Sequence, residues 1–166
     1  MAFCPSRPTI ARQRRRLTKA GLAGAMGCTA HKISAFESGD ASPDPIVIGC
    51  MAETLRFPFE FFFAGDIEPP STEDASFRSM ASMTDTQRNS TLSSCAIAIK
   101  LVEWLETKHN LPRQDLPNMR GHSPNAAVEA IRGTWALGER PIKNMIHLLD
   151  SKGVRVFSLV EECRQD

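Results

Sequence analysis

Apolar side chains recur at helical spacing in the first third of the chain, in short runs that glycines and capping residues separate. Leu22 and Met26 form one such pair, Ile33 and Phe36 form another, and Gly27 lies between the pairs. Residues three or four apart share one face of a helix, and glycine tolerates the left-handed backbone of a sharp turn. The pattern therefore predicts two short amphipathic helices joined by a tight turn.

Capping signals divide the rest of this region into further short helices. Ser6 with its following Pro8 is typical of a helix start, and Thr18 and Thr29 are good N-caps for the two central helices. The motif SPDP opens another helix, and the phenylalanine-rich segment FPFEFFF is typical of a short helix or turn that closes a core. The expected helices run over about 6–16, 18–27, 29–39 and 45–55, with a fifth short helix or turn at 57–63.

The second half of the chain follows an acidic segment, AGDIEPPSTEDA, whose proline pair and small number of apolar residues indicate a linker. Thr84 and Gln87 form a capping box for a long helix to about Lys108, and two further helices follow. The segment VRVFSL, residues 154–159, predicts a β-strand. A single strand is unstable alone, so it either pairs with a second copy or begins a truncated domain.

These patterns predict a mainly α protein. We expect an N-terminal five-helix domain over residues 1–66, a linker over 67–83 and a helical module over 84–166 that ends in one β-strand.

Charge is distributed unevenly along the chain. The net charge is only +1, yet residues 1–32 contain seven lysines or arginines and no acidic residue. This asymmetry indicates either a basic face for an anionic partner or a solvated basic tail, and charge alone does not separate the two.

The cysteines and the hydropathy of the chain indicate its location in the cell. The five cysteines are scattered and never form a C-x-x-C pair, which is typical of free thiols in a reducing cytoplasm. No apolar run approaches the ~18 residues that a membrane-spanning helix needs, and the N-terminus does not resemble a secretory signal. We therefore expect a cytoplasmic protein that does not contact a membrane.

The stretch RRLTKAGLAGAMGCTAHKISAFESGDASP resembles the helix-turn-helix of the Xre/Cro-like repressor family, over about residues 7–62. It carries R-x-L-T, then L-A, a glycine turn, a capped helix with an isoleucine, and E-x-G followed by proline. The resemblance implies a lambda-repressor-like fold and a recognition helix in the major groove of double-stranded DNA.

The resemblance also assigns candidate DNA-binding residues. Those expected to face base edges are Ala30, His31, Lys32, Ser34 and Ala35. Those expected near phosphates are Thr18, Lys19 and Thr29, with electrostatic attraction from Arg12, Arg14, Arg15 and Arg16.

Some features depart from the family pattern. Gly21 and Gly24 weaken the first helix of the pair, and the acidic segment after Gly39 does not attract phosphate. The alternative interpretation is a helical hairpin that contacts another protein. Cys28, at the start of the recognition segment, is interpreted as a small structural residue.

The second half, about residues 57–166, resembles the linker and helical segment of Xre-type regulators fused to an ImmA/IrrE-type zinc peptidase-like domain. That family carries H-E-x-x-H, in which two histidines bind zinc and the glutamate activates water. The chain has four histidines and no H-E-x-x-H. We therefore expect no enzymatic activity, no catalytic residues, no bound metal and no cofactor.

The resulting hypothesis is a repressor-like transcriptional regulator that binds DNA as a homodimer. The alternatives are a truncated remnant of a zinc-peptidase-linked regulator, or an antitoxin or adaptor that contacts a protein partner through the C-terminal half.

Overall fold

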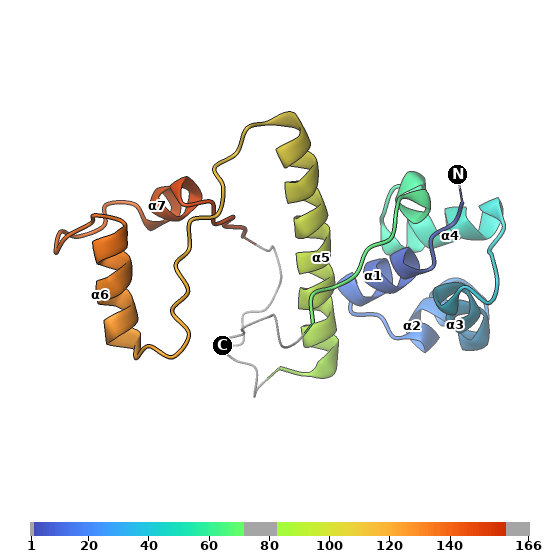
Figure 1. Ribbon diagram of the computed structural model, residues 1–166. Coiled ribbons are helices and arrows are strands. Elements are labelled where there is room, and N and C mark those ends of the chain that lie inside the picture. Colours follow the sequence, from blue (N-terminus) through green and yellow to red (C-terminus); the bar gives the residue numbers. More distant parts are fainter. Residues whose placement is uncertain (1, 72–82, 159–166) are drawn as a thin grey trace. The chain divides into compact units, whose positions relative to one another are not determined.

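The computed structural model describes residues 2–71 and 83–158, which are mainly α-helical and contain no β-strand (Figure 1). The chain divides into two compact units, Met1–Leu101 and Val102–Asp166. The helices of the first unit are α1 (Ser6–Arg14), α2 (Lys19–Ala25), α3 (Ala30–Ser38), α4 (Pro45–Leu55), the 3₁₀ helix η1 (Phe59–Phe63) and the first part of α5 (Asp85–Lys108). The second unit contains the end of α5, together with α6 (Pro124–Thr134) and α7 (Met145–Ser151).

Side-chain caps begin three of the short helices. Thr18, Thr29 and Asp44 each accept a hydrogen bond from the backbone N–H three residues further on, at 3.0, 3.3 and 2.9 Å. Each cap satisfies one of the N–H groups that a helix start leaves without an intrahelical partner. Gly27 and Gly39 follow α2 and α3 with φ values of 65° and 82°. The predicted starts of α2 and α3 and the turn between them are confirmed.

The first helix is shorter than the sequence predicts. It ends at Arg14 because Arg16 adopts a left-handed conformation with φ of 56°. The Leu17 N–H then bonds back to the Arg12 carbonyl at 3.1 Å. This bond closes the helix and turns the chain toward α2.

The main core lies among α1, α2, α3, α4 and η1. Of the five phenylalanines in the 57–63 segment, Phe62 is fully buried and Phe59 is the most exposed. The predicted short fifth helix is therefore present as η1, and it inserts Phe62 into the core. The buried members of this core are Ala11, Leu22, Ala23, Ile33, Phe36, Ile48, Met51, Ala52, Leu55 and Phe62.

The start of α5 follows the predicted capping box. The Thr84 N–H donates to the Gln87 side-chain oxygen at 2.8 Å, and the Gln87 N–H donates to the Thr84 hydroxyl at 3.2 Å. Two reciprocal bonds of this kind fix the first turn of a helix. The predicted start of the long helix is confirmed.

The first part of α5 packs against α1 through a second small core. Ile10, Ile67 and Ala96 are buried together there. Around them the Ser93 hydroxyl donates to the Gln13 side-chain oxygen at 2.9 Å. The first compact unit therefore extends to Leu101, beyond the predicted domain end at residue 66. The predicted linker begins at a buried residue, Ile67, and its residues 72–82 lie outside the described part of the chain.

The second unit buries fewer side chains than the first. Ser123 and Asn144 cap α6 and α7, and Gly153, with φ of 77°, follows the end of α7. Between residues 102 and 158 no side chain is buried.

The strand predicted over 154–159 is not formed in residues 154–158, and residue 159 lies outside the described residues. A strand needs a repeated ladder of backbone hydrogen bonds. Here one backbone bond joins the neighbouring segments, from the Asp115 N–H to the Lys152 carbonyl at 2.9 Å. The Pro112 carbonyl accepts instead from the Arg155 guanidinium, also at 2.9 Å. The Arg155 side chain, rather than a backbone N–H, is thus the donor to the Pro112 carbonyl.

Candidate nucleic-acid interface

Helices α2 and α3 pack against each other across the glycine turn. Leu22 and Ala23 from α2 and Ile33 and Phe36 from α3 are buried in the shared core. The Cys28 N–H donates to the Ala23 carbonyl at 2.9 Å and closes the turn. The small Ala23 side chain allows this close approach of the two helices. Helices α2 and α3 are thus the two short helices joined by a tight turn that the spacing of apolar residues predicts.

Helix α3 has a buried face and an exposed face. Ala30, His31 and Lys32, at the N-terminal end of the helix, are exposed. Ser34 and Ala35 are half-buried. Three of the five residues expected at base edges are therefore exposed to solvent, and the other two are exposed only in part.

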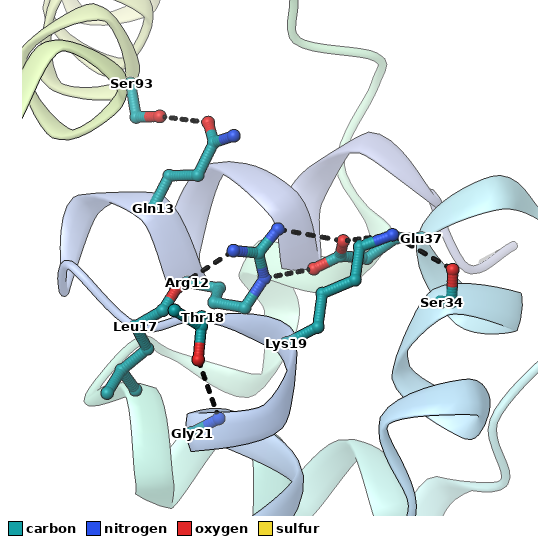
Figure 2. A network of polar contacts seen from close by, with 9 residues as sticks. All are labelled: Arg12, Gln13, Leu17, Thr18, Lys19, Gly21, Ser34, Glu37 and Ser93. Atoms are coloured by element: carbon teal, nitrogen blue, oxygen red, sulfur yellow. Dashed lines mark hydrogen bonds and ion pairs between the residues drawn. The ribbon is translucent and has the colours of Figure 1, made fainter. Parts of the chain in front are cut away.

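Lys19 extends from α2 to α3. Its ammonium donates to the Ser34 hydroxyl at 2.9 Å and lies 3.6 Å from a Glu37 carboxylate oxygen (Figure 2). The Lys19 side chain is still 45% exposed. It bridges the two helices while its charge stays accessible to solvent.

A buried ion pair joins α1 to α3. The Arg12 Nε and one terminal nitrogen donate to the two carboxylate oxygens of Glu37 at 2.6 and 2.9 Å, and the other terminal nitrogen donates to the Leu17 carbonyl at 2.8 Å (Figure 2). The two side chains are only 9% and 5% exposed. A bidentate arginine–carboxylate pair is strong and directional. We call this pair the Arg12–Glu37 clasp; it holds α3 against α1 and leaves Arg12 no accessible charge for DNA.

Arg15 contacts the C-terminal end of α4. Its guanidinium donates to the Leu55 carbonyl at 2.7 Å and to the Arg56 carbonyl at 3.1 Å, and it lies over the Phe57 ring at 5.4 Å. Burial lowers the Arg15 pKa from its usual value, and the neighbouring charges of Arg14 and Arg56 lower it further. Arginine stays protonated at neutral pH even so. Arg15 thus satisfies carbonyls that the end of α4 leaves without partners.

Arg7 is also used inside the protein. Its guanidinium donates twice to the Gly65 carbonyl, at 2.9 and 2.6 Å, and lies over the Phe61 ring. Together with Arg12 and Arg15, it accounts for three of the seven basic residues in the first 32. The basic segment is therefore partly a set of internal contacts, which the charge count did not reveal.

One sequence signal pointed to the clasp. Glu37 is the only acidic residue among the first 39. A lone carboxylate in a basic, amphipathic segment is a natural partner for one of the arginines. The carbonyl acceptors of Arg7 and Arg15 have no comparable signal, because every residue carries a carbonyl.

Two further findings bear on other kinds of site. Within residues 2–71 and 83–158, no group of three or more histidine, cysteine, aspartate or glutamate side chains lies close enough to hold a metal ion. None of the described helices has both the length and the apolar character that crossing a bilayer requires.

Comparison of the chain with protein-family models, with curated proteins and with solved structures gives no match in any of the three.

Proposed function

We propose that this protein is a sequence-specific, repressor-like transcriptional regulator that places α3 in the major groove of double-stranded DNA. The observation that supports the proposal best is the exposed N-terminal end of α3. Ala30, His31 and Lys32 project from a helix whose opposite face is fixed by Ile33, Phe36 and the Arg12–Glu37 clasp. A rigid helix with accessible polar side chains at its N-terminal end is what major-groove reading requires.

The side chains available on α3 suggest how bases would be read. Lys32 can donate to guanine O6 or N7, and His31 can donate to a base acceptor or a phosphate. Ala30 and Ala35 can contact only a thymine methyl group. Discrimination would rest mainly on two residues, so affinity for a single half-site would be modest.

Backbone contacts would come from a smaller set than the sequence suggests. Lys19 keeps an accessible ammonium beside α3, and Thr18 and Thr29 lie at the helix starts. Arg16 lies in the loop between α1 and α2. Arg15 would act mainly by holding α4, because its guanidinium contacts two backbone carbonyls.

The second unit would supply dimerisation or sensing. Its described residues have no buried side chain, yet many large apolar side chains are exposed there. Exposed apolar surface of this kind is typical of an interaction site. The residues are Trp104, Leu116, Val128, Met145, Ile146, Val156 and Phe157. A homodimer would place two α3 helices on two half-sites, and operator occupancy would then block or redirect polymerase.

The test of DNA reading begins with selection of bound duplexes from a random pool. His31→Ala and Lys32→Ala should each cost ~1–3 kcal/mol on the selected site and relax its sequence preference. Arg16→Ala should weaken selected and random duplexes alike and reduce the salt dependence by about one unit per lost phosphate contact. The measurement is a salt titration of both duplexes with each variant.

Two controls accompany this test. Lys108→Ala removes an exposed positive charge at the end of α5 and should change neither affinity nor preference. The second control is Arg15→Ala, which removes the hydrogen bond to the Leu55 carbonyl at the end of α4. Its thermal unfolding is measured together with its DNA affinity, so that a loss of stability is distinguished from a loss of DNA contacts. If the His31 and Lys32 variants keep both affinity and preference, α3 does not read DNA, and an adaptor or antitoxin that contacts a protein becomes the better account.

The proposal includes no catalytic step, metal or cofactor. We expect elemental analysis of protein purified in metal-free buffer to find no stoichiometric zinc. One zinc ion per chain would contradict this and would favour the zinc-peptidase-linked alternative.

A further inference from the structure

A small cavity lies between α3 and the start of α4, and two cysteines line it. Its volume is about 240 Å³. Cys28 and Cys50 line it together with the Lys32 side chain of α3. The remaining lining residues are Met26, Phe36, Ile46 and Val47. Two cysteines, one lysine and four apolar residues thus line a single cavity.

The cavity opens from the edge of the main core. Phe36 belongs to that core, and Met26, Cys28 and Val47 pack against it. Ile46, at the start of α4, is 85% exposed, the largest value among the exposed large apolar side chains of the described residues. An apolar group in the cavity would extend the core and cover the Ile46 side chain, so occupancy is favoured by burial of apolar surface.

The two thiols differ in access. Cys50 is exposed, whereas Cys28 is half-buried and its thiol lies 3.8 Å from the Thr29 carbonyl. Both are free thiols. Cys50 is therefore the first nucleophile that an incoming reagent meets, and Cys28 is the second.

We propose that this cavity is a modification site at which Cys50, with Cys28 in the same cavity, is alkylated by an apolar α,β-unsaturated carbonyl compound, and that the adduct lowers DNA affinity by engaging Lys32. In this addition the thiol loses its proton and the sulfur forms a bond to the β-carbon. The carbon–carbon double bond breaks, and its electron pair moves toward the carbonyl oxygen as an enolate. The α-carbon then takes up a proton, so no oxidant or reductant is needed.

Lys32 connects the cavity to the proposed function. Its ammonium can donate to the enolate and then to the carbonyl oxygen of the adduct. The same side chain is one of the two polar groups with which α3 would read bases, so an engaged Lys32 is lost to DNA. This regulatory step rests on the proposed DNA binding, whereas the reactivity of the cavity does not.

The first experiment measures labelling kinetics with the full chain and two probes, N-phenylmaleimide and the smaller N-methylmaleimide. Intact-mass and peptide analysis follow modification at each cysteine. We expect the rate at Cys50 to saturate with N-phenylmaleimide, because the ring binds in the cavity before the bond forms, and to rise linearly with N-methylmaleimide. Linear dependence with both probes would overturn the modification site.

Two variants separate binding in the cavity from simple exposure. Ile46→Ser removes an exposed apolar side chain at the cavity and should raise the N-phenylmaleimide concentration for half-saturation about tenfold. Val47→Phe fills the cavity while leaving both thiols, and it should abolish saturation. Cys95→Ser, on α5, is the matched cysteine control and should change nothing. Unchanged saturation in both cavity variants would show that the reagent binds elsewhere.

The second experiment measures DNA affinity after labelling. Wild-type protein labelled with N-phenylmaleimide should bind its selected duplex about tenfold more weakly, and treated protein carrying both Cys28→Ser and Cys50→Ser should bind as untreated protein does. Unchanged affinity of the labelled wild type would overturn the regulatory step. Absence of DNA binding before any treatment would contradict the proposed function, and the saturation kinetics decide the modification site in either case.

Discussion

At the scale of single residues, the main result is that the basic side chains near the N-terminus differ in burial and in the contacts that they make. The Arg12 guanidinium is buried against Glu37, whereas the Lys19 side chain, whose ammonium approaches the same carboxylate, is 45% exposed. Burial makes the two contacts differ in energy. Removing one partner of a buried pair leaves an uncompensated charge, while an exposed pair contributes little.

The clasp can be tested by a double-mutant cycle. Arg12→Met and Glu37→Leu should each lower the free energy of unfolding by about 3 kcal/mol, because each removes the bidentate partner of a charge that stays buried. The double variant should lose less than the sum of the two, since neither charge then remains. Urea denaturation followed by circular dichroism gives the three values.

Lys19→Met serves as the exposed comparison and should cost less than about 1 kcal/mol. Additive losses in the double variant, or a Lys19 effect as large as that of Arg12, would contradict the energetic role given to the clasp.

Sequence reasoning could anticipate a basic N-terminal region but not the use of each charge. The partners of Arg7, Arg12 and Arg15 lie 58, 25 and 40 residues further along the chain. Periodicity and charge counts describe residues a few positions apart, so contacts of this range leave little trace in them. The candidate residues of α3 were easier to place, because helical spacing alone separates Ile33 and Phe36 from the exposed positions.

At the scale of elements, helix boundaries with a local cause agree best with the sequence. The Thr18 and Thr29 caps, the Gly27 turn and the Thr84–Gln87 capping box each involve residues within five positions of one another. The predicted strand after Gly153 failed for the opposite reason. Its alternation of side chains is local, whereas a strand requires backbone partners elsewhere in the chain.

Two glycines on neighbouring helices provide a matched test of these local rules. Gly39 ends α3 with φ of 82°, and an added Cβ would lie 3.2 Å from the Pro5 ring. Gly24 lies inside α2 with no atom within 4 Å of an added Cβ. Gly39→Ala should therefore lower the free energy of unfolding by about 1–2 kcal/mol, whereas Gly24→Ala should raise it by about 0.5–1 kcal/mol.

Thermal unfolding of the two variants beside the parent protein measures both shifts. The same sign for both substitutions would mean that backbone conformation does not determine their effect.

At the scale of the whole molecule, the two units differ in how they are built. The first unit contains a core of ten buried apolar residues and a second cluster that joins α1 to α5. The described residues of the second unit bury no side chain. Cooperative unfolding depends on a shared core, so the units should differ in independent stability.

Fragments provide the measurement. Residues 1–101 should unfold in one cooperative transition. Residues 1–66 should be less stable by at least about 2 kcal/mol, because deleting Ile67 and Ala96 exposes Ile10. Residues 102–166 alone should show no cooperative transition.

Equal stability of the 1–66 and 1–101 fragments would support the domain end at residue 66 that the sequence predicts. A sharp transition in the 102–166 fragment would contradict the picture of a unit without its own core.

In helix α3, the residues that pack against the core differ from those that would contact DNA. This separation affects how substitutions could alter the DNA preference of the protein. Ile33, Phe36 and Glu37 attach the helix to the body of the domain, whereas Ala30, His31 and Lys32 are exposed. Surface substitutions of this kind usually alter stability by less than about 0.5 kcal/mol. A library that randomises only positions 30–32 should therefore yield mostly folded variants. New DNA preferences could then arise by single substitutions, without passing through unstable intermediates.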